Sequence, residues 1–318
     1  MLDIRKTQTE NYVEGEGILT ELKIDEGTSK KGNDYIRLNA SIKVDQEING
    51  KVVENVIDCR MFSMKLKSDG SVNSNYNRIA SYKDKLIPLA SVENPKDASR
   101  VKFTGSLAEN VYVSRSTGLL MDKNFEVDGK FINVVSNASS AKEDSAKFTL
   151  RNAIVGKNPT RETDKEGNET GRVKIDIIII GWKGKANVLQ FVTNTPEAAN
   201  FVEQNWSKGD SVNLTGVINC GSTVETYYEE QDFGEPIERN RTIRRRELVL
   251  CGASRPLDEK KSYDSNEIKE VLLERTAAND NLIAESKKKP APTPKPAPTP
   301  TAGGSVDFDW QFFRPQSI

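Results

Sequence analysis

One short segment of this chain occurs twice, and each copy stands in the same order of predicted elements. Residues 101–107 read VKFTGSL, and residues 212–218 read VNLTGVI. Both copies alternate as β-strands do, follow a candidate short helix, and precede a long polar and aromatic hairpin with a closing strand. Self-similarity on this scale indicates that the chain contains a duplicated structural unit.

The two units share their order although their lengths differ. In the first, we expect strands over residues 17–24, 35–42 and 56–64, a helix over 77–89 and a hairpin over 110–135. The second is expected to have strands over 149–155, 172–180 and 187–192, then a helix from Pro196 that stops by Gly209. Period-two alternation assigns these residues to the core: Ile36, Leu38, Ala40, Ile42, Ile57, Cys59, Met61, Val173, Ile175, Ile177 and Ile179. It assigns Arg172, Lys174, Asp176, Ile178 and Ile180 to the opposite face.

Three strands, a helix and two further strands is the element order of the OB-fold, a five-stranded Greek-key barrel. The predicted fold class is therefore all-β with short helices, as two tandem OB-fold barrels in residues 1–140 and 141–256. A helical segment is expected over 257–286, with its helix at 265–285. A Pro-rich disordered linker over 287–304 and an acidic, aromatic tip over 305–318 follow.

Composition excludes several classes of function. The chain has no histidine, and its three cysteines lack paired spacing, so we expect no zinc site, no cofactor and no enzymatic activity. The cysteines are interpreted as small buried hydrophobes. Chemistry on magnesium held by carboxylates alone stays open, because such sites need no motif. Without a hydrophobic signal region or a long apolar stretch, the chain is expected in the cytoplasm or nucleoid.

Net charge is −1, so any attraction to nucleic acid must be local. OB barrels bind oligonucleotides across strands two and three and the adjoining loops. Aromatic rings that stack on bases and cations that follow phosphates suit this task. On this face we expect Tyr35, Arg37, Arg60 and Phe62 from the first unit, and Arg172, Lys174, Trp182, Lys183, Lys185, Tyr227, Tyr228, Arg244, Arg245 and Arg246 from the second.

Each of these groups also has a purely structural interpretation. Tyr35 and Phe62 could be a cross-strand pair that stabilises the sheet. The arginine run 244–246 could protect a strand edge, and the acidic YYEEQDFGE half of the same hairpin weakens the case for nucleic acid there. Phe201 and Trp206 fall in the candidate helix and are expected in the core.

The segment EAANFVEQNWSKGDSVNLTGVI resembles a passage of single-stranded DNA-binding proteins in which a helix precedes the entry of a strand. The chain is most similar to the phage-type or tandem-OB members of that family. The resemblance implies a flexible tail whose acidic, hydrophobic end recruits replication and repair proteins. The matching residues are Asp307, Phe308, Asp309, Trp310, Phe312 and Phe313. Arg314 and Ile318 continue the chain where the family usually ends in a short acidic run and a phenylalanine.

Together these features predict a protein that binds and protects single-stranded DNA in replication, recombination or repair, with little sequence preference. The tail would recruit partners or compete with DNA, or act as a solubilising terminus. One alternative is a virion or assembly protein that uses OB barrels as protein-docking modules. Another is a metal-dependent nuclease. The oligomeric state stays open, because two barrels in one chain suit a monomer or a dimer.

Overall fold

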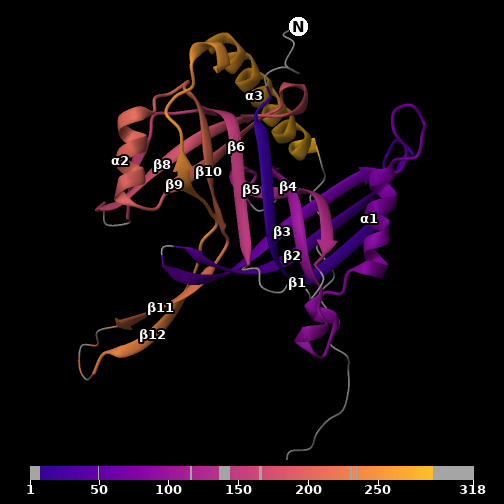
Figure 1. Cartoon of the computed structure of the whole chain (residues 1–318), viewed down its shortest axis with the longest axis horizontal. Coiled ribbons are helices and arrows are strands. Elements are labelled where there is room, and N and C mark those ends of the chain that lie inside the picture. Colours follow the sequence, from indigo (N-terminus) through magenta and orange to yellow (C-terminus); the bar gives the residue numbers. More distant parts are fainter. Residues whose placement is uncertain are drawn as a thin grey trace, which may run out of the picture.

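The computed structural model describes residues 8–48, 50–114, 117–135, 144–164, 167–229, 231, 233 and 235–288. Within them, β-strands make up most of the chain and three α-helices lie around the strands (Figure 1). In this part of the chain, no helix is long and apolar enough to cross a membrane.

Five strands of the first unit close into a ring. They are β1 (Glu10–Thr28), β2 (Asp34–Ile48), β3 (Lys51–Met64), β4 (Arg100–Val113) and β5 (Leu120–Val134). β1 pairs with β2 and β4, β2 with β3, and β4 with β5, all antiparallel. A short parallel pairing of β3 with β5, at Cys59 and Val127, closes the ring. With α1 (Ser74–Lys85) between β3 and β4, this is the order of an OB barrel.

The second unit closes in the same way. Its ring consists of β6 (Ser145–Val155), β8 (Glu169–Ile180), β9 (Ala186–Thr193), β10 (Ser211–Asn219) and β13 (Glu247–Ala253). β8 pairs with β6 and β9, and β10 pairs with β6 and β13, all antiparallel. A parallel pairing of β9 with β13 closes the ring. The helix α2 (Pro196–Asn205) lies between the third and fourth strands of this ring. The unit also has β7 (Thr160–Thr163) beside β8, and a separate ribbon of β11 (Ser222–Glu229) and β12 (Ile237–Arg244).

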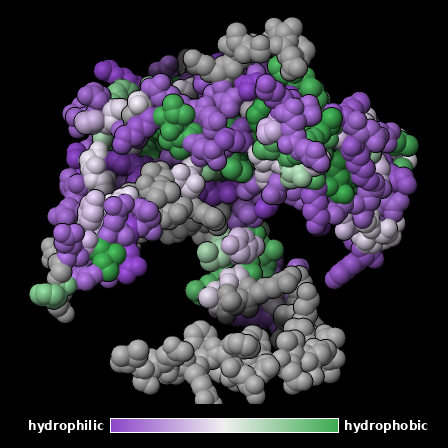
Figure 2. Space-filling model, turned by 90° about the horizontal axis from the view of Figure 1, so that it is seen from below, coloured by the Kyte–Doolittle hydropathy of each residue, from purple (hydrophilic) through white to green (hydrophobic). Residues whose placement is uncertain are grey.

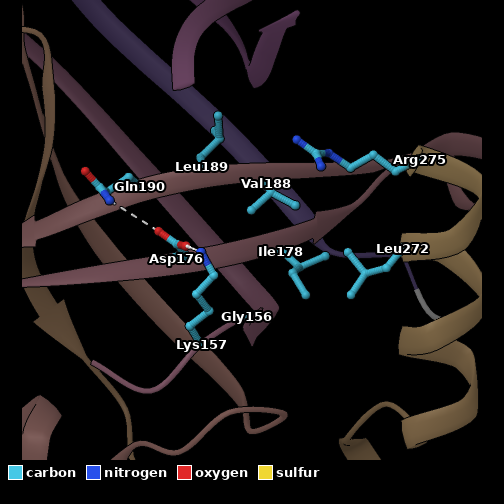
Figure 3. Close-up of a pocket in the computed structure, with 9 residues that line it drawn as sticks. All are labelled: Gly156, Lys157, Asp176, Ile178, Val188, Leu189, Gln190, Leu272 and Arg275. Carbon is cyan, nitrogen blue, oxygen red and sulfur yellow. Dashed lines mark hydrogen bonds and ion pairs between the residues drawn. The ribbon is translucent and has the colours of Figure 1, made fainter. Parts of the chain in front are cut away.

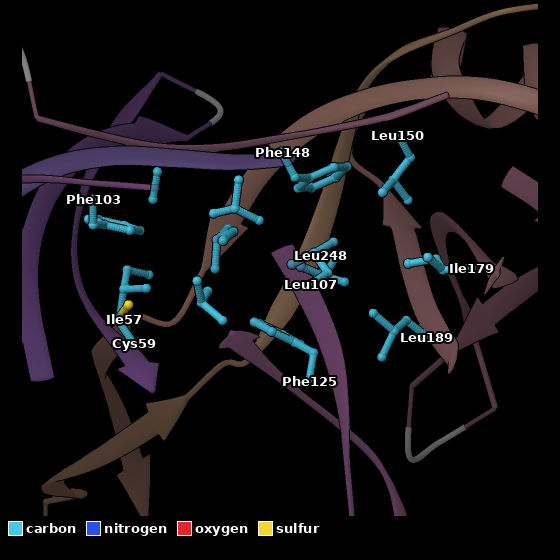
Figure 4. Packing of buried hydrophobic residues seen from close by; sticks show 14 of the residues in the cluster. Ile57, Cys59, Phe103, Leu107, Phe125, Phe148, Leu150, Ile179, Leu189 and Leu248 are labelled. Carbon is cyan, nitrogen blue, oxygen red and sulfur yellow. The ribbon is translucent and has the colours of Figure 1, made fainter. Parts of the chain in front are cut away.

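These rings confirm the predicted fold class, all-β and OB-like. The two rings are not separate bodies, because Glu10–Glu16 of β1 pair antiparallel with Ser145–Arg151 of β6 and join both into one sheet. Their apolar interiors are also continuous: one buried cluster contains Phe103 of the first ring and Phe148 of the second (Figure 4). The domain boundaries drawn from the sequence stay a prediction.

Most local expectations agree with the structure, with changes at the element ends. The residues assigned to the core in β2, β3 and β8 are buried. β1 begins seven residues earlier than the predicted strand at Gly17, because its first half pairs with β6. α1 begins after Asn73, whose side chain accepts a hydrogen bond from the Asn75 amide, and ends ahead of Pro88. Trp206 is buried and Phe201 packs against the core, as predicted.

Two residues on the second face of β8 lie opposite the barrel core, as predicted, and form part of a separate apolar cluster. Ile178 and Ile180 are buried, with 2% and 1% of their surface exposed. They are covered by the C-terminal helix α3 (Ser265–Lys288), which confirms the helix predicted there. Ile178 and Ile180 form a second apolar cluster with Tyr263 and Val271, against which Leu272 also packs.

An ion pair ties α3 to the first barrel as well. The Arg275 guanidinium contacts both carboxylate oxygens of Glu109 in β4, with Nε 3.0 Å from Oε2. Only 3% of the Glu109 side chain is exposed. Its Oε2 also accepts a hydrogen bond from the Val188 amide of β9 at 3.2 Å. Glu109 therefore holds one strand of each barrel and α3 together.

The cysteines differ in their environments. Cys59 is fully buried, and burial raises the pKa of its thiol to about 12. Cys220 is half-buried, and burial raises its pKa to about 11. Cys251 is exposed on β13, so the expectation that all three are buried was wrong at this position, because the residue falls on the outward side of the last strand.

The repeated Thr-Gly pair has a structural reason. In both barrels the strand register shifts at this pair, between Thr104 and Gly105 and between Thr215 and Gly216. The facing strand approaches so closely that a Cβ on Gly105 would lie closer than 3.0 Å to the carbonyl oxygen of Asp128. A Cβ on Gly216 would meet the carbonyl of Val249 and the Phe148 ring in the same way. The repeat thus marks a bulge in the fourth strand of each ring.

We expect Gly105→Ala to lower the free energy of unfolding by about 1 to 3 kcal/mol, because the methyl group overpacks against backbone that cannot yield. Gly181→Ala is the matched control, since its Cβ would meet only the Lys185 carbonyl at an ordinary 3.5 Å. Urea unfolding of both variants provides the comparison. Equal stability of the two would contradict the role given to the bulge.

Arg275→Met should lower the free energy of unfolding by about 3 kcal/mol, because it leaves the buried Glu109 carboxylate without its cation. The control is Lys23→Met, which removes an ion pair to Asp25 that is 3.5 Å long and largely exposed. That change should cost less than about 1 kcal/mol. If urea unfolding gave the two variants similar losses of free energy, the Arg275–Glu109 pair would contribute no more than a surface ion pair.

Candidate nucleic-acid interface

Three of the predicted residues form a compact group on the outer face of β2 and β3. The Tyr35 and Phe62 rings lie 5.7 Å apart between centroids and are tilted by 36°. The Arg37 guanidinium lies 4.8 Å from the centroid of the Tyr35 ring and 5.9 Å from that of Phe62. We call Tyr35, Arg37 and Phe62 the aromatic face.

The strand pattern places these side chains together. Ile36 and Met61 point into the barrel, so the residues beside them point outward. The register sets Arg37 directly opposite Phe62, and Tyr35 diagonal to it. Phe62 remains 56% exposed, so the ring pair leaves room for a further planar partner.

Two predicted cations border the aromatic face and both have acidic partners. Arg60 forms an ion pair with Glu126 of β5. Arg246, between β12 and β13, lies 3.4 Å from Asp58 and donates a 2.7 Å hydrogen bond to the Phe125 carbonyl. The second barrel therefore contributes a cation to the outer surface of the first.

The β11–β12 ribbon is held at its base by the first barrel. The Cys220 amide donates to the Asn55 side chain at 2.7 Å, and the Gln46 side chain donates to the Ile218 carbonyl at 2.6 Å. Beyond this base the ribbon projects away from both barrels (Figure 1). Tyr227 and Tyr228 are exposed on it and, as neighbours in a strand, point to opposite faces. The side chain of Arg244 lies outside the described part of the structure.

The corresponding cations of the second barrel are occupied by internal ion pairs. Arg172 contacts Glu162 at 3.4 Å and Glu247 at 3.0 Å, and its side chain is only 16% exposed. Lys174 contacts Glu162 at 3.2 Å. Burial raises the pKa of the Glu162 carboxyl, but the Lys174 hydrogen bond and the Arg172 charge outweigh burial, so this pKa lies below its ordinary value. These pairs hold β7 and β13 against β8.

The turn between β8 and β9 exposes the predicted indole. Trp182 is 61% exposed, and Lys183 and Lys185 beside it are exposed as well. Lys183 has a φ of 59°, as the tight turn requires. Trp182, Lys183 and Lys185 therefore form a second basic and aromatic group, on a different barrel from the aromatic face.

A family model described as YorF matches residues 10–288. The chain belongs to the YorF family. The match begins at the first residue of β1 and ends at the last residue of α3, so both barrels and the C-terminal helix belong to the unit that the YorF family shares.

No curated protein matches the sequence significantly. Among solved structures, the chain is similar to the wild-type single-stranded DNA-binding protein from Thermus aquaticus, at 13% sequence identity and a TM-score of 0.47. The similarity covers 81% of this chain and 98% of that one.

The YorF match includes every predicted DNA-binding residue and none of the predicted tail residues. The latter, Asp307, Phe308, Asp309, Trp310, Phe312 and Phe313, lie outside the described residues. Sequence reasoning predicted the helix at 265–285 but missed that it covers the outer face of β8. The available signal was the apolar pair Ile178 and Ile180 at outward positions, together with Ile268, Val271 and Leu272 on one side of the predicted helix.

Proposed function

We propose that this protein binds single-stranded DNA with little sequence preference, chiefly through the first barrel. The observation that carries the proposal is the aromatic face, which lies on the second and third strands of a closed OB ring. Oligonucleotides bind OB barrels at this position. Tyr35, Arg37 and Phe62 combine rings for stacking with a cation for phosphate.

The exposure of these residues supports a binding role over a purely structural one. A ring pair that only stabilised the sheet would gain most by burying both rings, because the gain follows the apolar area removed from water. Phe62 instead keeps more than half of its surface in solvent. Arg37 is also exposed, so its charge can reach a phosphate while its plane contacts both rings.

The two arginines that border the aromatic face would exchange their carboxylate partners for phosphates of the DNA. Arg60 and Arg246 each have an acidic partner at the surface, with 48% and 38% of their side chains exposed. Exposed pairs of this kind are worth little, about 1 kcal/mol or less, so a phosphate can replace the carboxylate at small cost. Each phosphate that is neutralised releases counterions, which makes the affinity depend on salt.

The two barrels would contribute unequally. α3 covers the part of the β8–β9 face that contains Ile178 and Ile180, and Arg172 is enclosed by carboxylates. We therefore assign strand binding to the aromatic face first, with Trp182, Lys183 and Lys185 as a secondary contact. Arg172 and Lys174 have structural roles in this proposal.

The wider role we propose is non-enzymatic: coating of single strands during replication, recombination or repair, in the cytoplasm or nucleoid. The predicted tip at 305–318 would recruit partner proteins or compete with DNA. A phage source, inferred from the resemblance, stays a prediction.

Phe62→Leu should weaken binding of a thymidine oligonucleotide about 5- to 150-fold, because a stacked base is worth about 1 to 3 kcal/mol and leucine keeps the apolar character without the ring. The matched control is Phe131→Leu, which removes a 45% exposed ring that contacts Arg78 rather than the aromatic face. Fluorescence anisotropy of both variants measures the difference. Equal affinities would show that the aromatic face does not stack on DNA.

The whole proposal is tested by titrating the protein with labelled oligo-dT at two salt concentrations, following anisotropy and intrinsic fluorescence together. Binding that weakens with salt and quenches fluorescence would support it. Absence of binding at low salt would overturn it and favour OB barrels that dock proteins.

A further inference from the structure

A pocket of about 310 Å³ lies between α3 and the outer face of β8 and β9 (Figure 3). Its lining residues come from four segments: the residues after β6, the two strands and the helix. They are Gly156, Lys157, Asp176, Ile178, Val188, Leu189, Gln190, Leu272 and Arg275. This is the remainder of the surface with which the second OB barrel would bind a ligand, after α3 has covered the end nearest the β8–β9 turn.

One wall of the pocket is aliphatic. Ile178 and Val188 rise from neighbouring positions of β8 and β9, where the register pairs them directly, and Leu272 faces them from α3 (Figure 3). Leu272 and Val188 pack against the cluster that contains Ile178, so this wall is continuous from the strands to the helix. A planar ring laid against the exposed parts of Val188 and Leu272 would bury apolar area of both.

The other wall is polar and carries both donors and acceptors. Gln190 donates from Nε2 to Asp176 Oδ1 at 3.3 Å, and Lys157 Nζ lies 2.7 Å from Asp176 Oδ2 (Figure 3). Asp176 and Gln190 are paired across the two strands, two residues further along from Ile178 and Val188. Lys157 is 76% exposed and stands at the rim, where its charge can turn outward.

We propose that this pocket binds one nucleobase of a single strand held by the protein; the inference rests on the proposed function. The size suits a nucleotide, since ligand pockets begin at about 300 Å³. A base has an apolar plane for the aliphatic wall and an edge of donors and acceptors for Asp176 and Gln190. Its phosphate would meet Lys157 at the rim.

The chemistry of the pocket disfavours other ligands of this size. An acid placed inside would have to compete with the Asp176 carboxylate for Lys157, which is already paired with it. A purely apolar molecule would cover Asp176 and Gln190 without replacing their contacts with water, which costs free energy. A neutral, planar heterocycle avoids both penalties.

The test uses thymidine monophosphate as the probe and the intact protein, followed by NMR with ¹⁵N-labelled side-chain amides and labelled leucine methyls. The nucleotide should shift the resonances of Gln190 and Leu272. Leu272→Trp should abolish these shifts, because the indole fills the pocket. Leu273→Trp is the matched control, since Leu273 is the next residue of the same helix and is 71% exposed.

A long oligo-dT provides the second readout. Leu272→Trp should weaken its binding about fivefold, because one base would lose its apolar contact with the pocket. Gln190→Met, an exposed position whose change should leave the fold intact, should also weaken it, while Leu273→Trp should not. Phe62→Leu should affect the oligonucleotide but leave the shifts at Gln190 unchanged.

The outcomes separate the pocket from the aromatic face. If oligo-dT binds and depends on Phe62, but Gln190 does not respond to the nucleotide and both pocket variants bind normally, the pocket inference is wrong and the proposed function stands. If oligo-dT does not bind at all, the proposed function fails first. Shifts at Gln190 that survive in Leu272→Trp would also overturn the pocket assignment.

Discussion

The antiparallel pairing of β1 with β6 is the contact on which the rest of the architecture depends. The first half of β1 uses both of its edges, because residues from Val13 to Glu16 pair with β4 on one side and β6 on the other. The second half then turns into its own barrel and pairs with β2. A single strand of 19 residues therefore closes one ring and joins it to the next. Since neither edge of this segment stays unpaired, the two barrels are fixed side by side without an exposed seam.

This junction sets the positions of the surface elements. The first barrel's β2–β3 hairpin reaches the base of the β11–β12 ribbon, where Asn55 binds Cys220 and Arg246 reaches Asp58. On the other side, Glu109 of the first barrel lies close enough to β9 to accept a hydrogen bond from Val188. Arg275 can then bind Glu109 from α3, so the helix is anchored to both barrels at once.

The result is a pair of similar barrels with different outer faces. The first exposes Tyr35, Arg37 and Phe62, whereas α3 covers part of the corresponding face of the second and leaves a pocket of about 310 Å³. Duplication of a binding fold thus need not duplicate the binding site. In the proposed function, the first barrel supplies an open stacking surface and supports the base of the ribbon, and the second supplies the base pocket.

The sequence alone determined the local order of the molecule. Alternation placed Ile36 inside and Tyr35 outside, because side chains of a strand must point to opposite faces, and the repeated Thr-Gly pair marked the same strand in both barrels. The turn sequence around Trp182 also predicted correctly that this side chain is exposed. What only the tertiary structure decided was which outward residues stay in water. Ile178 and Ile180 are outward by periodicity but buried by a helix about 90 residues later in the chain, and Arg172 is enclosed by carboxylates from two other strands. Such long-range contacts depend on how the elements pack, and no local pattern contains that information.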